Sequence, residues 1–143
     1  MKVTTRNSNE TKKTAADFLS CLKPGGGATI VALSGDLGSG KTTFTQGVAD
    51  ALGIKDQVTS PTFVLLKVYD TANAIFKRLV HVDAYRLQKN TEIGTIGLTD
   101  YVTDPHNLIL IEWPEIVEKA SIVPTKKIFF TFIDETTREI EFV

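Results

Sequence analysis

A glycine-rich run that ends in a lysine and two threonines has the clearest chemistry in the sequence. It reads GDLGSGKTT over residues 35–43 and fits the pattern G-x-x-x-x-G-K-[ST] without a mismatch. Glycines let consecutive backbone N–H groups point inward and form an anion-binding concavity. The charge of Lys41 suits the outer phosphates of a nucleotide, and the Thr42 hydroxyl can ligate a magnesium ion that bridges them. The motif therefore predicts a phosphate site.

Two carboxylates belong to apolar runs that are typical of buried strands. Glu112 ends the run LILIE, and Asp83 lies within LVHVDAYR. Ligands of open α/β sheets bind beyond the carboxyl ends of strands, so we interpret Glu112 as a magnesium ligand and Asp83 as a group that orients or deprotonates water. A surface glutamate and a turn-capping aspartate are the alternatives. A zinc pair of His81 with Asp83 is disfavoured, because the chain has two histidines and one cysteine.

Two further stretches leave a structural and a functional interpretation open. The loop TSPTF, Thr59 to Phe63, follows the P-loop helix, where P-loop proteins commonly carry a hydroxyl that senses the γ-phosphate or magnesium. It is equally interpretable as an ordinary loop that leads into a strand. Trp113 directly follows Glu112, and it either packs under the sheet edge or acts as an aromatic sensor beside the loop.

The flanking residues predict the elements that must position the loop. ATIVALS, residues 28–34, is an apolar run typical of a buried strand. After the loop, Phe44, Val48, Ala51 and Leu52 share one helical face. Gly53 is a predicted helix stop. Strand, loop and helix in this order are the setting that a phosphate-binding loop requires.

The rest of the chain completes an α/β pattern. We expect a short strand over residues 2–5 and a helix over about 8–22, with Asn7 and Glu10 as a capping box. Later apolar runs predict strands, and the last two flank a turn at residues 135–137 as a terminal hairpin. The predicted fold is a P-loop NTPase-like single domain over residues 1–143, with a mixed, mostly parallel sheet flanked by helices and the P-loop on an interior strand.

Bulk properties exclude several classes of protein. The 143 residues carry a formal net charge of −1, which gives no basic bias for direct nucleic-acid binding. Cys21 is the only cysteine, so an internal disulfide is excluded, and we expect it to be a core residue. The first residues do not resemble a signal peptide, and no apolar run reaches membrane-spanning length. We therefore expect a cytoplasmic protein without a membrane contact.

Four stretches occur together in a characteristic order: GDLGSGKTTFTQGVADALGI, VTSPTF, HVDAYRL and LIEWPE. Together they resemble the TsaE family, formerly called YjeE, of small bacterial P-loop ATPases in tRNA threonylcarbamoyladenosine synthesis. The Walker motif alone is generic, but its combination with S-P-T-F, H-x-D-x-Y-R-L and E-W-P in a short chain is specific. The resemblance extends from about Asn7 to the last strand.

The resemblance implies a role for each matching position. Magnesium would bind Thr42 and Glu112, while hydrolysis would depend on Asp83 and on Thr62 in the switch loop. The residues that it places at ATP, with Thr11 and Arg138 toward the adenine, are Thr11, Gly38, Ser39, Gly40, Lys41, Thr42, Thr43, Trp113 and Arg138.

The resemblance also implies partners. The family acts with TsaD, which carries the transferase chemistry, and with TsaB, and ATP hydrolysis is thought to reset their complex between turnovers. The chain would then be a weak, partner-stimulated, Mg²⁺-dependent ATPase that meets tRNA only through the complex. One departure is the segment RLQKNTEIGTIGLTDY, Arg86 to Tyr101, where the family is usually acidic with several glutamates and this chain has Glu92 as its only glutamate. A partner surface there would differ in detail.

Other nucleotide-dependent functions fit less well. A small-molecule kinase is the main alternative, but such kinases use several arginines as phosphate clamps. Of Arg6, Arg78, Arg86 and Arg138, only Arg86 is predicted close to a candidate site by its place in the sequence. A GTP switch protein would need an N-K-x-D motif, which is absent from the sequence. A module that binds a nucleotide without hydrolysing it would have the same loop.

Overall fold

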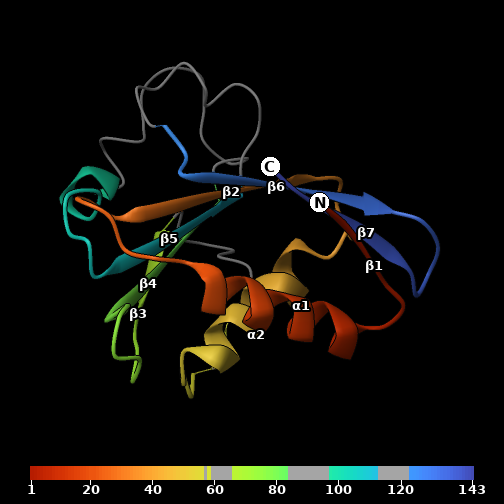
Figure 1. Ribbon diagram of the computed structural model, residues 1–143, viewed down its shortest axis with the longest axis horizontal. Helices are drawn as coiled ribbons and strands as arrows, with labels where there is room; N and C mark the ends of the chain where they lie inside the picture. Colours follow the sequence, from red (N-terminus) through yellow and green to blue (C-terminus); the bar gives the residue numbers. More distant parts are fainter. Residues whose placement is uncertain (57, 59–65, 84–96, 113–122) are drawn as a thin grey trace.

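The computed structural model describes residues 1–56, 58, 66–83, 97–112 and 123–143. It confirms the α/β class, with helices packed on a mixed sheet (Figure 1). In chain order the described elements are β1 (Lys2–Thr5), α1 (Ser8–Cys21), β2 (Thr29–Gly35), α2 (Lys41–Ala51), β3 (Leu66–Asp70), β4 (Arg78–Asp83), the short 3₁₀ helix η2 (Leu98–Asp100), β5 (Asn107–Glu112), β6 (Lys126–Phe132) and β7 (Arg138–Phe142). Among these helices, none is long and apolar enough to cross a membrane.

In the described part of the chain the sheet has seven strands, in the order β1-β7-β6-β2-β5-β4-β3. β2 lies in the interior and runs parallel to both of its neighbours, β6 and β5, as expected for the strand before the glycine-rich loop. β4 is also parallel to β5, whereas the outer pairings β1–β7, β7–β6 and β3–β4 are antiparallel. The carboxyl ends of β2, β4 and β5 therefore meet at one edge of the sheet.

The two helices α1 and α2 pack side by side on one face of the sheet (Figure 1). The start of α1 is fixed by hydrogen bonds close to those predicted: the Asn7 side chain accepts from the Glu10 N–H at 2.8 Å. The Glu10 carboxylate in turn accepts from the N–H of Arg6 at 2.6 Å, where a standard capping box would use Asn7 itself. The N-terminus of α1 is thereby fixed directly after β1.

Both faces of the central strands are buried. On the helix side the core includes Leu33, Phe44, Val48, Leu110 and Ile128. On the opposite side a second cluster is formed by Ile30, Ala32, Val80, Val82, Leu98, Ile109 and Ile111. Strands that are covered on both faces have nearly continuous apolar sequences, which explains why these runs do not alternate between apolar and polar residues.

Two sequence expectations about buried positions are wrong. Cys21 is exposed, because it is two residues after the buried Leu19 and thus about 200° around a helix with 3.6 residues per turn. Ala51 is also exposed, whereas Ala49 is buried on the face of α2 that turns toward the core. Gly53 does end the helix, with φ at 76°.

Gly47 sets the distance between α1 and α2, and we predict that Gly47→Ala destabilises the fold. A Cβ at this position would lie 2.7 Å from Lys12 Cα and 2.9 Å from Ala15 Cβ. Alanine improves helix propensity by about 1 kcal/mol, but forcing apart a packed contact costs about 1–3 kcal/mol. Because the obstacle is partly backbone, we expect a net decrease in the free energy of unfolding, measured by urea denaturation.

The matched control is Gly26→Ala, which removes a glycine where an added Cβ would meet nothing within 4 Å. It should leave the urea midpoint unchanged or raise it slightly, since it only restricts the unfolded chain. A Gly47→Ala protein as stable as this control would mean that the two helices separate without cost.

Candidate nucleotide-binding site

The glycine-rich loop connects the carboxyl end of β2 to the first turn of α2. Gly40 is the N-cap of α2 and has φ at 107°, in the left-handed region. Gly35 also needs the absence of a side chain, because a Cβ there would lie 2.6 Å from the carbonyl oxygen of Phe130 in β6. The loop therefore turns tightly against the sheet. The first N–H groups of a helix have no partner within the helix, so those of α2 are available to an anion bound at the loop.

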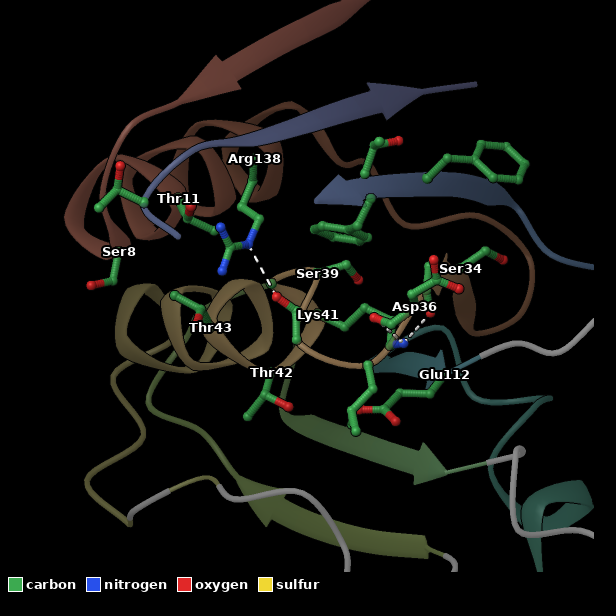
Figure 2. Close-up of a pocket in the computed structure, with 18 of the residues that line it drawn as sticks. Ser8, Thr11, Ser34, Asp36, Ser39, Lys41, Thr42, Thr43, Glu112 and Arg138 are labelled. Atoms are coloured by element: carbon green, nitrogen blue, oxygen red, sulfur yellow. Dashed lines mark hydrogen bonds between the residues drawn. The ribbon is translucent and has the colours of Figure 1, made fainter. Parts of the chain in front are cut away.

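Lys41 extends from the first residue of α2 back across this loop. Its Nζ donates to the carbonyl oxygen of Gly35 and, at 3.4 Å, to that of Asp36. Figure 2 shows the ammonium group at the ends of these two hydrogen bonds, among the loop residues. A positive charge is thus held at the loop where the sequence predicts phosphate.

The loop borders an open cavity of ≈ 1280 Å³. This volume exceeds the roughly 300–1,000 Å³ that is typical of small-molecule sites, so a nucleoside triphosphate has room. The cavity brings together nine of the predicted site residues: Thr11, Gly38, Ser39, Gly40, Lys41, Thr42, Thr43, Asp83 and Glu112, with Arg138 as a tenth. Segments separated by more than a hundred positions in the sequence therefore line one space.

The two predicted carboxylates end neighbouring parallel strands. Asp83 at the end of β4 is the register partner of Glu112 at the end of β5, and Glu112 is also the partner of Leu33 in β2. Asp83 is 5% exposed and Glu112 is 7% exposed, and both line the cavity. Two acidic residues on adjacent strands thus line one cavity, and a bound cation would be stabilised by their negative charge.

The residues present fit a magnesium ion better than a zinc ion. In the described part of the chain, no group of three or more His, Cys, Asp or Glu side chains is arranged to hold a metal. Magnesium suits the site because it takes few protein oxygens and completes its shell with phosphate and water. Thr42 and Glu112 supply such oxygens, and Ser39 adds a buried hydroxyl that has no hydrogen-bond partner among the described residues.

Thr11 and Arg138 lie on the far side of the loop from Glu112 (Figure 2). Thr11 is buried, and its hydroxyl is 2.8 Å from that of Thr5. The guanidinium of Arg138 donates to the Gly38 carbonyl at 3.1 Å and lies over the ring of Phe132. Arg138 was predicted at ATP only through the resemblance, whereas its place in the sequence gave no such indication. It does line the cavity.

Several predicted residues lie outside the part of the chain that the structure describes. They are Thr62 and the rest of the loop Thr59–Phe63, Trp113, and most of the segment Arg86–Tyr101. Their assigned roles stay predictions.

Sequence reasoning missed one wall of the cavity. The tip of the β6–β7 hairpin contributes Glu135 and Thr136, and β6 contributes Phe129 and Thr131. The hairpin itself was predicted from its turn residues. Its place beside the loop follows from the pairing of β6 with β2, which no local pattern in either strand reveals.

Comparison with known proteins gives a consistent result. The family model described as "Threonylcarbamoyl adenosine biosynthesis protein TsaE" matches residues 5–140. A tRNA threonylcarbamoyladenosine biosynthesis protein TsaE from Bacillus subtilis is 36% identical over 142 residues, covering 99% of this chain and 84% of the relative. The protein of the same name from Rickettsia felis is 38% identical over 133 residues, covering 92% of this chain and 73% of the relative.

A solved structure is similar as well. The crystal structure of Bacillus subtilis YdiB superposes with a TM-score of 0.70 at 32% sequence identity and covers 99% of this chain and 83% of YdiB. The family model spans the strand, loop and helix of the phosphate site as well as both carboxylates and Arg138. This chain therefore belongs to the TsaE family of tRNA threonylcarbamoyladenosine biosynthesis proteins.

Proposed function

We propose that this chain binds and hydrolyses ATP as an accessory protein for threonylcarbamoyladenosine modification of tRNA, acting on a TsaB–TsaD complex. The observation that carries the proposal is the meeting of a complete Walker loop with Asp83 and Glu112 in one cavity of a TsaE-family chain. Membership of the family supports the assignment to this pathway. The residues that line the cavity support the activity of a nucleoside triphosphatase.

In this proposal the loop holds the triphosphate through backbone N–H groups, and Lys41 neutralises the outer phosphates. Thr42 and Glu112 would hold magnesium. When bound, the ion would neutralise the negative charge that develops on the phosphates. Asp83, next to Glu112 in register, orients the attacking water or accepts its proton. Thr62 and Trp113 are proposed to act beside it, in the switch loop and next to the nucleotide.

We propose that the chain alone is a weak ATPase and that its partners stimulate it. The cavity is open in the part of the chain that the structure describes, and closure over the nucleotide, which excludes water, is what commits many such sites to reaction. Docking on TsaB–TsaD would bring the loop Thr59–Phe63 to the phosphates and complete the site. The chain would contact tRNA only indirectly, through that complex. We propose that it acts in the cytoplasm.

The proposal predicts that multiple-turnover modification of tRNA requires this chain. The assay contains TsaB and TsaD from the same organism, tRNA, bicarbonate, threonine, ATP and the enzyme that makes threonylcarbamoyl-adenylate. With this chain present, product should keep accumulating beyond the amount of TsaD, and the partner pair should raise ATP hydrolysis. Without it, modification should stop after the first turnover, because nothing resets the complex.

Two measurements make this test specific. Replacing the chain by its Lys41→Ala form should also stop modification after the first turnover, whereas Lys55→Ala, which changes an exposed lysine outside the cavity, should support full turnover. Undiminished modification over many turnovers in the absence of the chain would refute the proposed role.

A further inference from the structure

His81 is a buried side chain that the proposed function leaves unused. It lies within β4 and is flanked on both sides by paired strands, with Lys67 of β3 and Leu110 of β5 as its register partners. Its exposure is 0%. Among the described residues, neither Nδ1 nor Nε2 has a hydrogen-bond partner.

The ring nonetheless carries at least one N–H donor in either neutral tautomer. A buried donor without an acceptor is costly and therefore rare in folded proteins. Glu112 offers an acceptor close by, because its Oε1 lies 3.6 Å from His81 Nε2. This separation is slightly longer than a hydrogen bond, and a small rotation of the glutamate side chain would close it.

The strand pattern explains why these two side chains meet. Residues two apart in a strand point to the same face, so His81 and Asp83 both face the helices with Leu79. Glu112 is the register partner of Asp83 in the adjacent strand and lies on that face too, with Leu110. His81 is therefore two residues further from the carboxyl end of the strands than the two carboxylates. It lies between them and the core.

We propose that His81 is a positioning residue for Glu112: its Nε2–H donates to Oε1 and leaves the other carboxylate oxygen to the magnesium ion. This inference rests on the proposed function, since it assumes that Glu112 is a magnesium ligand. Groups that hydrogen-bond to ligating side chains fix their orientation and tune metal affinity. A glutamate side chain has several rotatable bonds, so a hydrogen bond from His81 would restrict the orientation of its carboxylate. The imidazole ring itself is already held in place by its burial.

The test compares His81→Leu, which removes both nitrogens, with His81→Gln, whose amide N–H can reach toward Glu112. ATP binding is measured by calorimetry at a series of magnesium concentrations and in EDTA. In His81→Leu we expect the magnesium concentration for half-maximal enhancement of binding to increase by about 10–100-fold. Binding in EDTA should stay unchanged, and His81→Gln should recover most of the magnesium response.

A purely structural role of His81 predicts a different pattern. Leu79→Ala opens a cavity in the same strand, on the same face, and is the matched control. It should lower the thermal midpoint without changing the magnesium response. If His81→Leu behaves like Leu79→Ala while Glu112→Gln loses the response, the positioning role is overturned and the magnesium role of Glu112 stands. If Glu112→Gln also keeps the response, the proposed metal site itself is refuted.

A measurement on the unaltered protein keeps the proposal testable where variants fold poorly. Long-range ¹H–¹⁵N correlation spectra distinguish the two neutral tautomers of a histidine. We expect the Nε2–H tautomer for His81, with its nitrogen signal shifting when Glu112 is replaced by glutamine. A ring protonated only at Nδ1 has no donor for Glu112 and would overturn the proposal.

Discussion

Lys41→Ala should lower the affinity for ATP by on the order of 100-fold or more, the largest binding effect that we expect from one substitution. The ammonium group is held at the phosphate loop by the carbonyls of Gly35 and Asp36. When ATP is bound, we expect the ammonium group to donate to two phosphate oxygens. Each charge-assisted hydrogen bond of this kind contributes about 1.5–3 kcal/mol, so losing two of them lowers the affinity by about 100-fold or more. Calorimetric titration with ATP and magnesium measures the change directly.

The control for this effect is Lys55→Ala, which removes the same charge from an exposed position that does not line the cavity. It should bind ATP like the unaltered protein, and circular dichroism should show that both variants are folded. Equal ATP affinities for Lys41→Ala and Lys55→Ala would mean that the glycine-rich loop does not hold the phosphates.

The parts of the fold that follow from local chemistry could be predicted from the sequence. Glycines at set positions between an apolar β-branched run and an amphipathic segment predicted the strand, loop and helix, because each step depends on neighbouring residues. The terminal hairpin could be predicted for the same reason, from two strands around a polar turn. Its position could not: pairing of β6 with β2 places the hairpin tip and Arg138 at the phosphate loop. That contact joins residues one hundred positions apart, and no periodicity encodes it.

The candidate site shows the same division. Asp83 and Glu112 could be predicted to lie at the candidate site because each is a carboxylate at the exit of a buried strand. Their adjacency depends on the order and register of β4 and β5, which appear only in the fold. The same register brings His81 beneath Glu112, whereas the sequence could suggest only a weak zinc pair. Cys21 was misjudged because an apolar residue near a helix end can fall on either face, and the true face is decided by packing against α2.

Asp83→Asn should leave ATP binding nearly unchanged and lower the partner-stimulated rate of hydrolysis by about 100–10,000-fold, the usual contribution of a positioned general base. Asparagine keeps the size and most hydrogen-bonding capacity of the side chain but cannot accept a proton from water. Asp83 is 5% exposed, lines the cavity and is the register partner of Glu112, so its carboxylate is placed to act on a water molecule there. Phosphate release in the presence of TsaB and TsaD measures the rate.

Asp70→Asn is the matched control, because Asp70 is an exposed carboxylate at the end of β3, in register with Arg78 at the end of β4 remote from Asp83. It should retain full activity.

The position of Asp83 fits two roles, a water-positioning group and a metal ligand, and the magnesium dependence of ATP binding distinguishes them. A water-positioning group lost in Asp83→Asn leaves the magnesium dependence of ATP binding intact, whereas loss of a metal ligand would weaken it as Glu112→Gln does. An unaltered hydrolysis rate in Asp83→Asn would contradict both roles and leave Glu112 as the acidic group on which hydrolysis depends.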